Sequence, residues 1–210
     1  NINLLIITNE VTHMAGTALL VHGFNVRDNG AGTIARLSPY LLTRGYDTVV
    51  FRMGWMEIVQ VYTQNKRHAK RLAEAARNAK INNSKPVIAL GHSNGCAVIH
   101  LATTLYDAPI DKIAYLNPAL EKQLAPGEQV QSVDVWYSPS DAPVKWARWL
   151  PKHVWGEMGR TGYVGKDPRM VNHNKQDDYL VSSKKHSDFA RAEKLTYFAP
   201  LIINQLVHGL

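Results

Sequence analysis

The feature that most constrains the fold of this chain is a set of apolar runs that are not interrupted by polar residues. A strand with one solvated face alternates apolar and polar residues, whereas a strand covered on both faces is apolar throughout. The runs therefore predict a mostly parallel sheet buried between two layers. The five expected strands are Thr17–Gly23, Asp47–Met53, Pro86–His92, Lys112–Pro118 and Ser132–Ser138, with Asn3–Asn9 and Arg169–Asn174 as further candidates.

The stretches between the predicted strands repeat apolar residues three and four positions apart, which is the period of an amphipathic helix. The clearest case is residues 67–80. Residues 33–45 and 94–107 are also helical in pattern, and the end of the chain from Ala199 reads as a last helix with Pro200 in its first turn. Strands that alternate with helices predict right-handed βαβ units, so the expected fold is a three-layer α/β fold with helices on both faces of the sheet.

The length of 210 residues predicts one domain over residues 1–210. Residues 142–166 fit neither the strand nor the helix period and suggest a small lid or insertion. The single cysteine, Cys96, excludes an intrachain disulfide, and the first residues lack a signal-peptide pattern. These features predict a cytoplasmic protein. No apolar run is long enough to cross a bilayer, so no transmembrane segment is expected.

The formal net charge of +7 leaves anionic partners to be considered. The basic residues are mostly scattered, and the densest groups, at residues 65–71 and 182–185, are typical of solvated surfaces. No nucleic-acid-binding motif accompanies them, so no nucleic acid partner is expected. The histidines form no HExxH pattern and there is no cysteine pair, so neither a metal nor an organic cofactor is expected. The oligomeric state is left open.

The segment "VIALGHSNGCAVIHLA", residues 87–102, contains the pattern Gly-x-Ser-x-Gly between an expected strand and an expected helix. Glycines on either side of Ser93 allow a tight turn, because they remove the Cβ atoms that would clash with the strand and the helix. Such a turn presents the serine hydroxyl at the carboxyl edge of the sheet, beside the N–H groups of a helix N-terminus. Ser93 is therefore the candidate nucleophile. Cys96 reads as a small core residue.

A serine nucleophile needs a base to take its proton and an acid to orient that base. Asp141 lies just beyond the expected strand Ser132–Ser138, and His186 follows later in the chain. The chain order Ser93, Asp141, His186 is the one expected for a nucleophile on a strand-to-helix turn. The alternatives that stay open are His173 as the strongest rival base, His153 and His208 as weaker ones, and Asp134, Asp177 and Asp178 as rival acids.

Attack on a carbonyl creates a negatively charged oxygen that backbone N–H groups can stabilise. The residue after the nucleophile, Asn94, is the first candidate donor. The second should come from the loop after an earlier strand, where "VHGFN" places the N–H of Phe24, with that of Asn25 next to it.

Together these residues resemble the α/β-hydrolase superfamily, as a compact esterase- or lipase-like member. The resemblance extends from about Thr17 to the C-terminus and is carried by "HGF" at residues 22–24, "GHSNG" at residues 91–95, Asp141 and His186. "YLNPAL", residues 115–120, is similar to the strand that commonly follows the nucleophile helix. The resemblance implies a Ser93, Asp141 and His186 triad with an oxyanion hole at Phe24 and Asn94.

The function expected from these residues is that of an esterase, lipase or thioesterase, which hydrolyses a small or lipid-like ester through an acyl-enzyme on Ser93. Trp55, Trp146 and Trp149 are candidates to line the substrate site, with Trp155 as a further aromatic residue in the same region. Two alternatives are kept: an amidase or peptidase that uses the same residues, and a non-catalytic binding module on the same scaffold.

Overall fold

The structure is a computed structural model that describes residues 14–24, 26–54, 60–141, 155–175 and 185–208. Its centre is a six-stranded parallel sheet in the order β2-β1-β3-β4-β5-β6. The expected candidate Asn3–Asn9 lies outside the described residues, and Arg169–Asn174 is confirmed as the edge strand. The strands are β1 (Gly16–Val21), β2 (Tyr46–Phe51), β3 (Val87–His92), β4 (Lys112–Leu116), β5 (Ser132–Tyr137) and β6 (Met170–Asn174).

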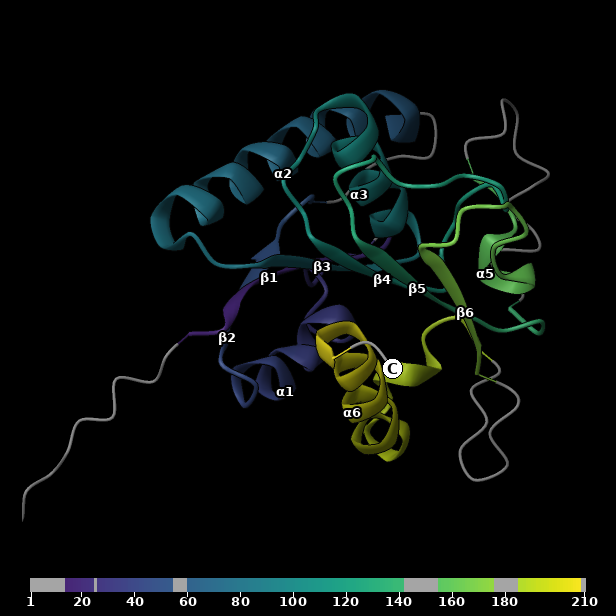
Figure 1. The fold of residues 1–210 in the computed structure, drawn as a ribbon. Helices are drawn as coiled ribbons and strands as arrows, with labels where there is room; N and C mark the ends of the chain where they lie inside the picture. Colours follow the sequence, from purple (N-terminus) through teal and green to yellow (C-terminus); the bar gives the residue numbers. More distant parts are fainter. Residues whose placement is uncertain (1–13, 25, 55–59, 142–154, 176–184, 209–210) are drawn as a thin grey trace, which may run out of the picture.

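Helices cover both faces of the sheet, as Figure 1 shows. Helices α2 (Val61–Asn83) and α3 (Asn94–Leu105) pack on one face, and α1 (Ser38–Leu42) and α6 (Ala192–His208) pack on the other. The prediction of a three-layer α/β fold is therefore confirmed. The remaining short elements are the 3-10 turns Ile34–Leu37 and Asp188–Ala190 and the helix α5 (Met158–Thr161), which lies beside β5 and β6.

Strand β3 shows why the apolar runs are continuous. Val87 and Ala89 belong to the core under α2 and α3, whereas Ile88 and Leu90 belong to the core under α1 and α6. Each residue of the strand is thus buried on one face or the other. The two half-cores hold the sheet in place, and neither side of β3 tolerates a charge.

Two helices begin earlier than the sequence pattern predicts. Helix α2 starts at Val61, and α6 starts at Ala192 rather than at Ala199. Pro200 consequently lies in the interior of α6 and not in its first turn. The earlier start follows from burial, because Leu195 and Phe198 continue the apolar stripe of α6 into the core. The packing of this stripe offsets the missing N–H of the proline.

The described part of residues 142–166 packs into the body of the protein. Trp155, Met158 and Tyr163 are all buried in the core under α2 and α3. Residues 142–154, where the rest of the expected lid or insertion falls, lie outside the described residues.

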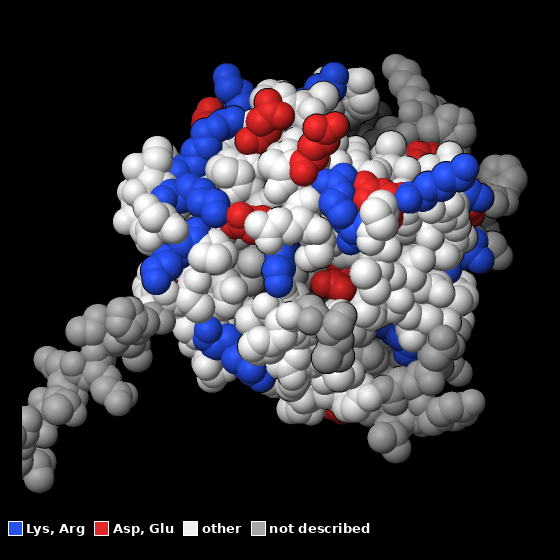
Figure 2. All heavy atoms as spheres, in the orientation of Figure 1, with Lys and Arg blue, Asp and Glu red and all other residues white. Residues whose placement is uncertain are grey.

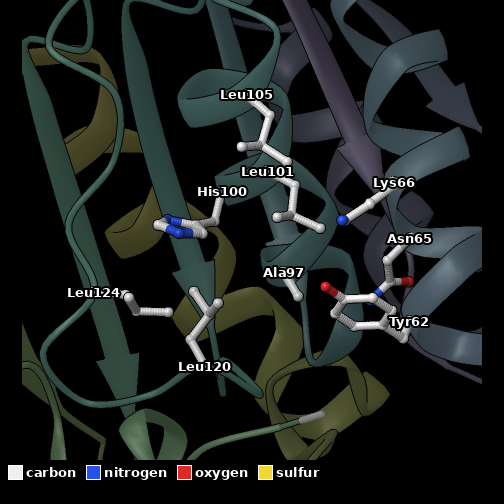
Figure 3. Close-up of a pocket in the computed structure, with 9 residues that line it drawn as sticks. All are labelled: Tyr62, Asn65, Lys66, Ala97, His100, Leu101, Leu105, Leu120 and Leu124. Carbon is white, nitrogen blue, oxygen red and sulfur yellow. The ribbon is translucent and has the colours of Figure 1, made fainter.

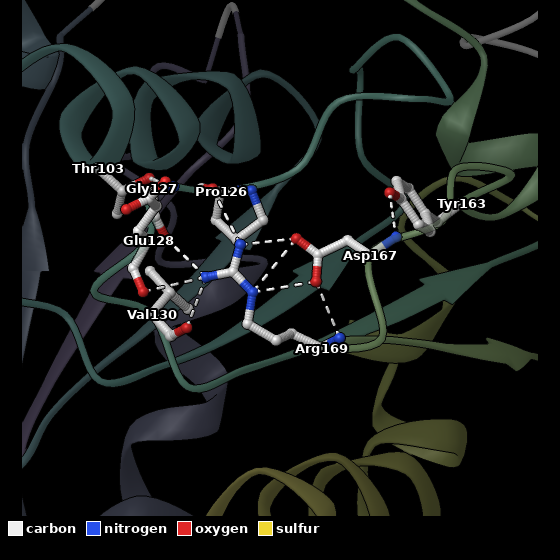
Figure 4. Close-up of polar contacts among 8 residues, drawn as sticks. All are labelled: Thr103, Pro126, Gly127, Glu128, Val130, Tyr163, Asp167 and Arg169. Carbon is white, nitrogen blue, oxygen red and sulfur yellow. Dashed lines mark hydrogen bonds and ion pairs between the residues drawn. The ribbon is translucent and has the colours of Figure 1, made fainter.

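The edge of the sheet at the strand N-termini is fastened by ion pairs. Arg169, just before β6, pairs with Asp167 and donates to backbone carbonyls of the loop before β5, among them those of Gly127 and Val130 at 2.9 and 2.8 Å (Figure 4). At the same edge, Lys80 of α2 pairs with Asp111 at 2.7 Å. In open α/β sheets ligands bind at the opposite edge, beyond the C-termini of the strands.

The basic group at residues 65–71 lies largely on the solvent side of α2, where Lys66, Arg67, Lys70 and Arg71 are exposed. On the face shown in Figure 2, basic side chains are spread over the surface with acidic ones among them. Within the described ranges, no helix combines the length and the apolar character that crossing a bilayer requires.

Helix α3 approaches the sheet through Gly95, and this contact gives a stability prediction. A Cβ atom on Gly95 would lie 2.3 Å from the carbonyl oxygen of Val21 and 2.5 Å from that of His22. Since these are backbone atoms of β1 and of the loop after it, the clash cannot be relieved by a rotamer change. We expect Gly95→Ala to lower the free energy of unfolding by about 3 kcal/mol, measured by urea denaturation.

Gly32→Ala is the matched control for that change. A Cβ atom on Gly32 meets only a surface carboxylate oxygen of Asp28, at 3.0 Å, which can move aside. Equal stability of the two variants would show that α3 can shift away from β1 at little cost.

Candidate active site

The bend after β3 has the strained backbone that the Gly-x-Ser-x-Gly pattern predicts. Ser93 has φ 54° and ψ −121°, a conformation that costs a residue with a Cβ about 1–3 kcal/mol. A Cβ atom on Gly91 would lie 2.7 Å from the Cδ1 atom of Ile99 and 3.0 Å from the backbone nitrogen of Cys96. Both flanking glycines are therefore required for the strand to turn so tightly into α3. The backbone N–H of Ser93 donates to the carbonyl of Leu116 at 3.0 Å, which fixes the bend to β4.

The loop after β1 lies directly against this bend. A Cβ atom on Gly23 would be 3.2 Å from the Cβ atom of Ser93. His22 fixes the loop, since its Nδ1 lies 2.9 Å from the carbonyl oxygen of Gly23 and its Nε2 accepts the N–H of Met53 at 3.2 Å. Burial lowers the pKa of His22, so it is neutral and serves as a connector between the ends of β1 and β2. Strands β1 and β3 flank the point where the strand order reverses, the usual crevice of an open α/β sheet.

The structure brings the candidate acid Asp141 and the candidate base His186 into contact. Nδ1 of His186 donates to Oδ2 of Asp141 at 2.7 Å. The Asp141 side chain is fully buried, and that of His186 is 16% exposed. Because an ionised carboxylate only accepts hydrogen bonds, Nδ1 carries the proton and Nε2 of His186 is the free basic nitrogen.

The strongest rival base, His173, is committed to a different carboxylate. Its Nε2 donates to Oδ1 of Asp134 at 2.7 Å, and its ring stacks on Trp136 with centroids 4.3 Å apart. His173 lies on the edge strand β6 and Asp134 on its neighbour β5, so β4 stands between this pair and β3. The pair thus joins two strands inside the sheet.

The other rivals are placed as follows. His208 ends α6, where its Nε2 lies 3.4 Å from Nη1 of Arg44 on the surface. His153, Asp177 and Asp178 fall outside the described residues, as do Asn25 and the substrate-site candidates Trp55, Trp146 and Trp149.

The side chain of Asn94, the residue after Ser93, is fixed by hydrogen bonds to two neighbouring side chains. Its Oδ1 accepts a hydrogen bond from Nδ2 of Asn65 at 2.9 Å and another from Nε1 of Trp155 at 2.7 Å, while its Nδ2 donates back to Asn65 at 2.9 Å. Trp155 also packs edge-on against Phe24, with ring centroids 5.1 Å apart. One indole therefore contacts both residues whose N–H groups are the candidate oxyanion donors.

His92, the residue before Ser93, lies beneath His186. Its Nε2 is 3.1 Å from the carbonyl oxygen of His186, and the two rings are 4.8 Å apart. Burial, followed by the charge of nearby His186, holds the pKa of His92 well below its usual value. His92 is therefore a neutral packing residue that supports the backbone at His186.

An apolar groove of about 340 Å³ runs between α2, α3 and the loop after β4 (Figure 3). Asn65 lies in its wall and connects it to Asn94. His100 also lines it, and burial lowers the pKa of this imidazole to about 4, so the groove is uncharged at this point. Its lining is completed by Tyr62, Lys66, Ala97, Leu101, Leu105, Leu120 and Leu124.

Sequence reasoning missed two polar residues at the site. Nδ2 of Asn117 donates to Oδ2 of Asp141 at 2.6 Å, and Nζ of Lys175 donates to Oδ1 of Asn117. Asn117 directly follows β4 and Lys175 directly follows β6. A polar residue at the carboxyl end of a predicted parallel strand was the available signal, since such ends converge on one edge.

No protein-family model matches the chain, and no curated protein matches it. Several solved structures, in contrast, align with the structure of this chain. An esterase from Pyrococcus furiosus aligns with a TM-score of 0.61 at 12% identity, over 93% of this chain and 85% of that one. A CIB-like hydrolase from Thermoplasma acidophilum aligns with a TM-score of 0.54 at 17% identity, over 93% and 87% of the two chains.

A hydrolase of the α/β superfamily from Xanthomonas campestris aligns with a TM-score of 0.50 at 15% identity, over 90% of this chain and 99% of that one. At these identities the likeness concerns the backbone, and it agrees with the parallel sheet and its two helical layers described above. The chain has the α/β-hydrolase fold.

Proposed function

We propose that this protein is a serine hydrolase that cleaves carboxylic esters through an acyl-enzyme on Ser93. The observation that carries the proposal is the 2.7 Å hydrogen bond between His186 and buried Asp141, at the same sheet edge as the strained bend at Ser93. A bond of this kind fixes the tautomer of the imidazole and stabilises its protonated form.

In the proposed reaction, Nε2 of His186 takes the hydroxyl proton as Oγ of Ser93 bonds to the ester carbonyl carbon. The tetrahedral intermediate collapses with loss of the alcohol, which receives the proton from His186. Water then attacks the acyl-enzyme, again giving its proton to Nε2, and the acid leaves as Ser93 regains its hydrogen. Asp141 stays ionised throughout and holds the imidazole in position.

The proposed oxyanion donors are the backbone N–H groups of Phe24 and Asn94. In a trans peptide the C=O and N–H groups point in opposite directions. Because Nδ1 of His22 donates to the carbonyl of Gly23, the N–H of Phe24 in that same peptide points away from His22. Asn94 begins α3, so its N–H has no acceptor within the helix. Removing one such donor typically lowers kcat by about 10²–10³-fold.

An ester is proposed over an amide because an alkoxide leaves a tetrahedral intermediate more readily than an unprotonated amine. Neighbours of the same fold include an esterase, which supports this choice. Four leucines and Ala97 line much of the groove beside Asn65, and this apolar part of the lining suits an aliphatic acyl group.

A fluorophosphonate probe tests the nucleophile without knowledge of the substrate. We expect the folded protein to be labelled once, on the peptide that contains Ser93, as located by mass spectrometry. Heat-unfolded protein serves as the control and should not react, because the hydroxyl is activated only by the folded site.

Matched p-nitrophenyl ester, thioester and anilide substrates of one acyl group then identify the leaving group. We expect the ester to have the highest kcat/KM. Absence of both labelling and turnover would favour a binding module on the scaffold, and a preference for the anilide would favour the amidase alternative.

A further inference from the structure

Lys175 is the unusual charged residue of this site, because lysine is rarely buried completely. Its side chain is 2% exposed, and its Nζ lies 5.8 Å from the centre of the Phe189 ring. Its backbone N–H donates to the carbonyl of Tyr137 at 3.0 Å, which extends the pairing of β5 and β6 to the sheet edge. A lysine held in this way costs stability, so its position needs a reason.

The hydrogen bond that Lys175 makes to Asn117 explains why a lysine is buried here. Its Nζ donates to Oδ1 of Asn117, and the Nδ2 of the same amide donates to Oδ2 of Asp141 at 2.6 Å. Lysine has donors only and an ionised carboxylate has acceptors only, so the two partners hold opposite ends of the Asn117 amide. Asn117 itself is fully buried and in the left-handed region, with φ 47°, and its N–H is bonded to the carbonyl of Trp136 at 2.8 Å.

We propose that Lys175 is a positioning residue that locks the amide of Asn117 and, through it, orients the carboxylate of Asp141 toward His186. This inference rests on the proposed function of His186 as the base. Without Lys175, Oδ1 of Asn117 would be buried without a donor, and the amide would rotate to find one. Asp141 would then lose the hydrogen bond that Asn117 donates to its Oδ2, and its carboxylate would be less firmly oriented toward His186.

The surroundings of Lys175 indicate that it acts as a hydrogen-bond donor and does not need to carry a permanent positive charge. Burial is the main cause that lowers its pKa to about 7; Asp141 and Asp188 counteract this effect, and Lys194 adds to it. The cation also contributes to the lowered pKa of His92. Lysine therefore becomes a neutral amine near pH 7, and an amine still has N–H groups to donate. The hydrogen bond from Nζ of Lys175 to Oδ1 of Asn117 can therefore form both below and above pH 7.

Two substitutions distinguish the effect of the hydrogen bond that Lys175 donates from the effect of its side-chain volume. Lys175→Met keeps most of the length and has no donor, whereas Lys175→Gln can present an amide N–H to Asn117. We expect kcat for a p-nitrophenyl ester to fall about tenfold in Lys175→Met and to return to within about threefold of wild type in Lys175→Gln. Lys80→Met, which removes the lysine paired with Asp111 at the opposite sheet edge, is the control and should leave kcat unchanged.

A second readout does not need turnover. The Nδ1 proton of His186, assigned by its loss in His186→Ala, should give a low-field NMR signal because it is bonded to Asp141. We expect this signal to shift or broaden in Lys175→Met and to stay near its wild-type position in Lys175→Gln and Lys80→Met. Thermal denaturation shows whether each variant is folded; if Lys175→Met is not, Lys175→Gln decides.

The outcomes distinguish the two proposals. An unmoved His186 signal and unchanged kcat in folded Lys175→Met overturn the positioning role and leave the esterase proposal intact. A folded Lys175→Gln that loses activity and the signal also overturns it, because donation would then not suffice. If the wild-type protein hydrolyses no ester, the esterase proposal fails, and the NMR signal still reports whether Lys175 orients Asp141.

Discussion

Replacing Ser93 with alanine is expected to lower kcat for a p-nitrophenyl ester by about 10⁶-fold, the typical loss when a serine hydrolase loses its nucleophile. Alanine keeps the Cβ atom but removes the oxygen that forms the acyl bond. The remaining groups, including the proposed N–H donors of Phe24 and Asn94, still bind the substrate, so a residual rate about 10³–10⁴-fold above that in water is expected. Burst and steady-state release of p-nitrophenol measure both quantities.

The backbone at Ser93 provides the control for this change. With φ 54° and ψ −121°, serine and alanine are equally strained, so Ser93→Ala should unfold at the wild-type temperature. Ser93→Gly relieves the strain and should raise the free energy of unfolding by about 1 kcal/mol, since glycine's greater freedom in the unfolded chain cancels part of the gain. Wild-type turnover in folded Ser93→Ala would assign the chemistry to another group.

The fold was predictable because its main signal is local. Uninterrupted apolar runs such as Val87–His92 indicate burial on both faces, and that condition alone selects a parallel sheet between helical layers. Helix boundaries were less predictable. The start of α6 at Ala192 depends on Leu195 and Phe198 packing against the sheet, and a proline nine residues into the helix is an ambiguous signal without that contact.

Candidate site residues can be proposed from the sequence where a motif or a chain order exists. Ser93 is marked by its glycines, and Asp141 and His186 follow in the order that the fold uses. Asn117 and Lys175 carry no such mark, because their role arises only where the ends of β4, β5 and β6 converge. An asparagine and a lysine beyond strand ends read equally well as turn and surface residues, and only the fold shows that both are buried.

The two histidine–aspartate pairs allow the base to be tested with a closely matched control. His186 and His173 each donate to a buried carboxylate at 2.7 Å, but His186 lies beyond the strands, whereas His173 lies within β6. We expect His186→Ala to lower kcat by about 10⁵–10⁶-fold, because Ser93 then has no base. We expect His173→Ala to change kcat by no more than about twofold.

Both substitutions should lower the free energy of unfolding, so a loss of activity in only one of them cannot be explained by lost stability. Each alanine leaves a buried carboxylate without its histidine donor, a loss of about 1–3 kcal/mol. Asp141 keeps the N–H of Asn117 as a second donor, so His186→Ala should be the less destabilised variant. If His173→Ala instead lost activity while remaining folded at the assay temperature, Asp134 and His173 would have to reach Ser93 in a sheet arrangement different from the one described. We therefore expect the two variants to rank in opposite orders: His186→Ala loses far more activity than His173→Ala, and His173→Ala loses more stability than His186→Ala.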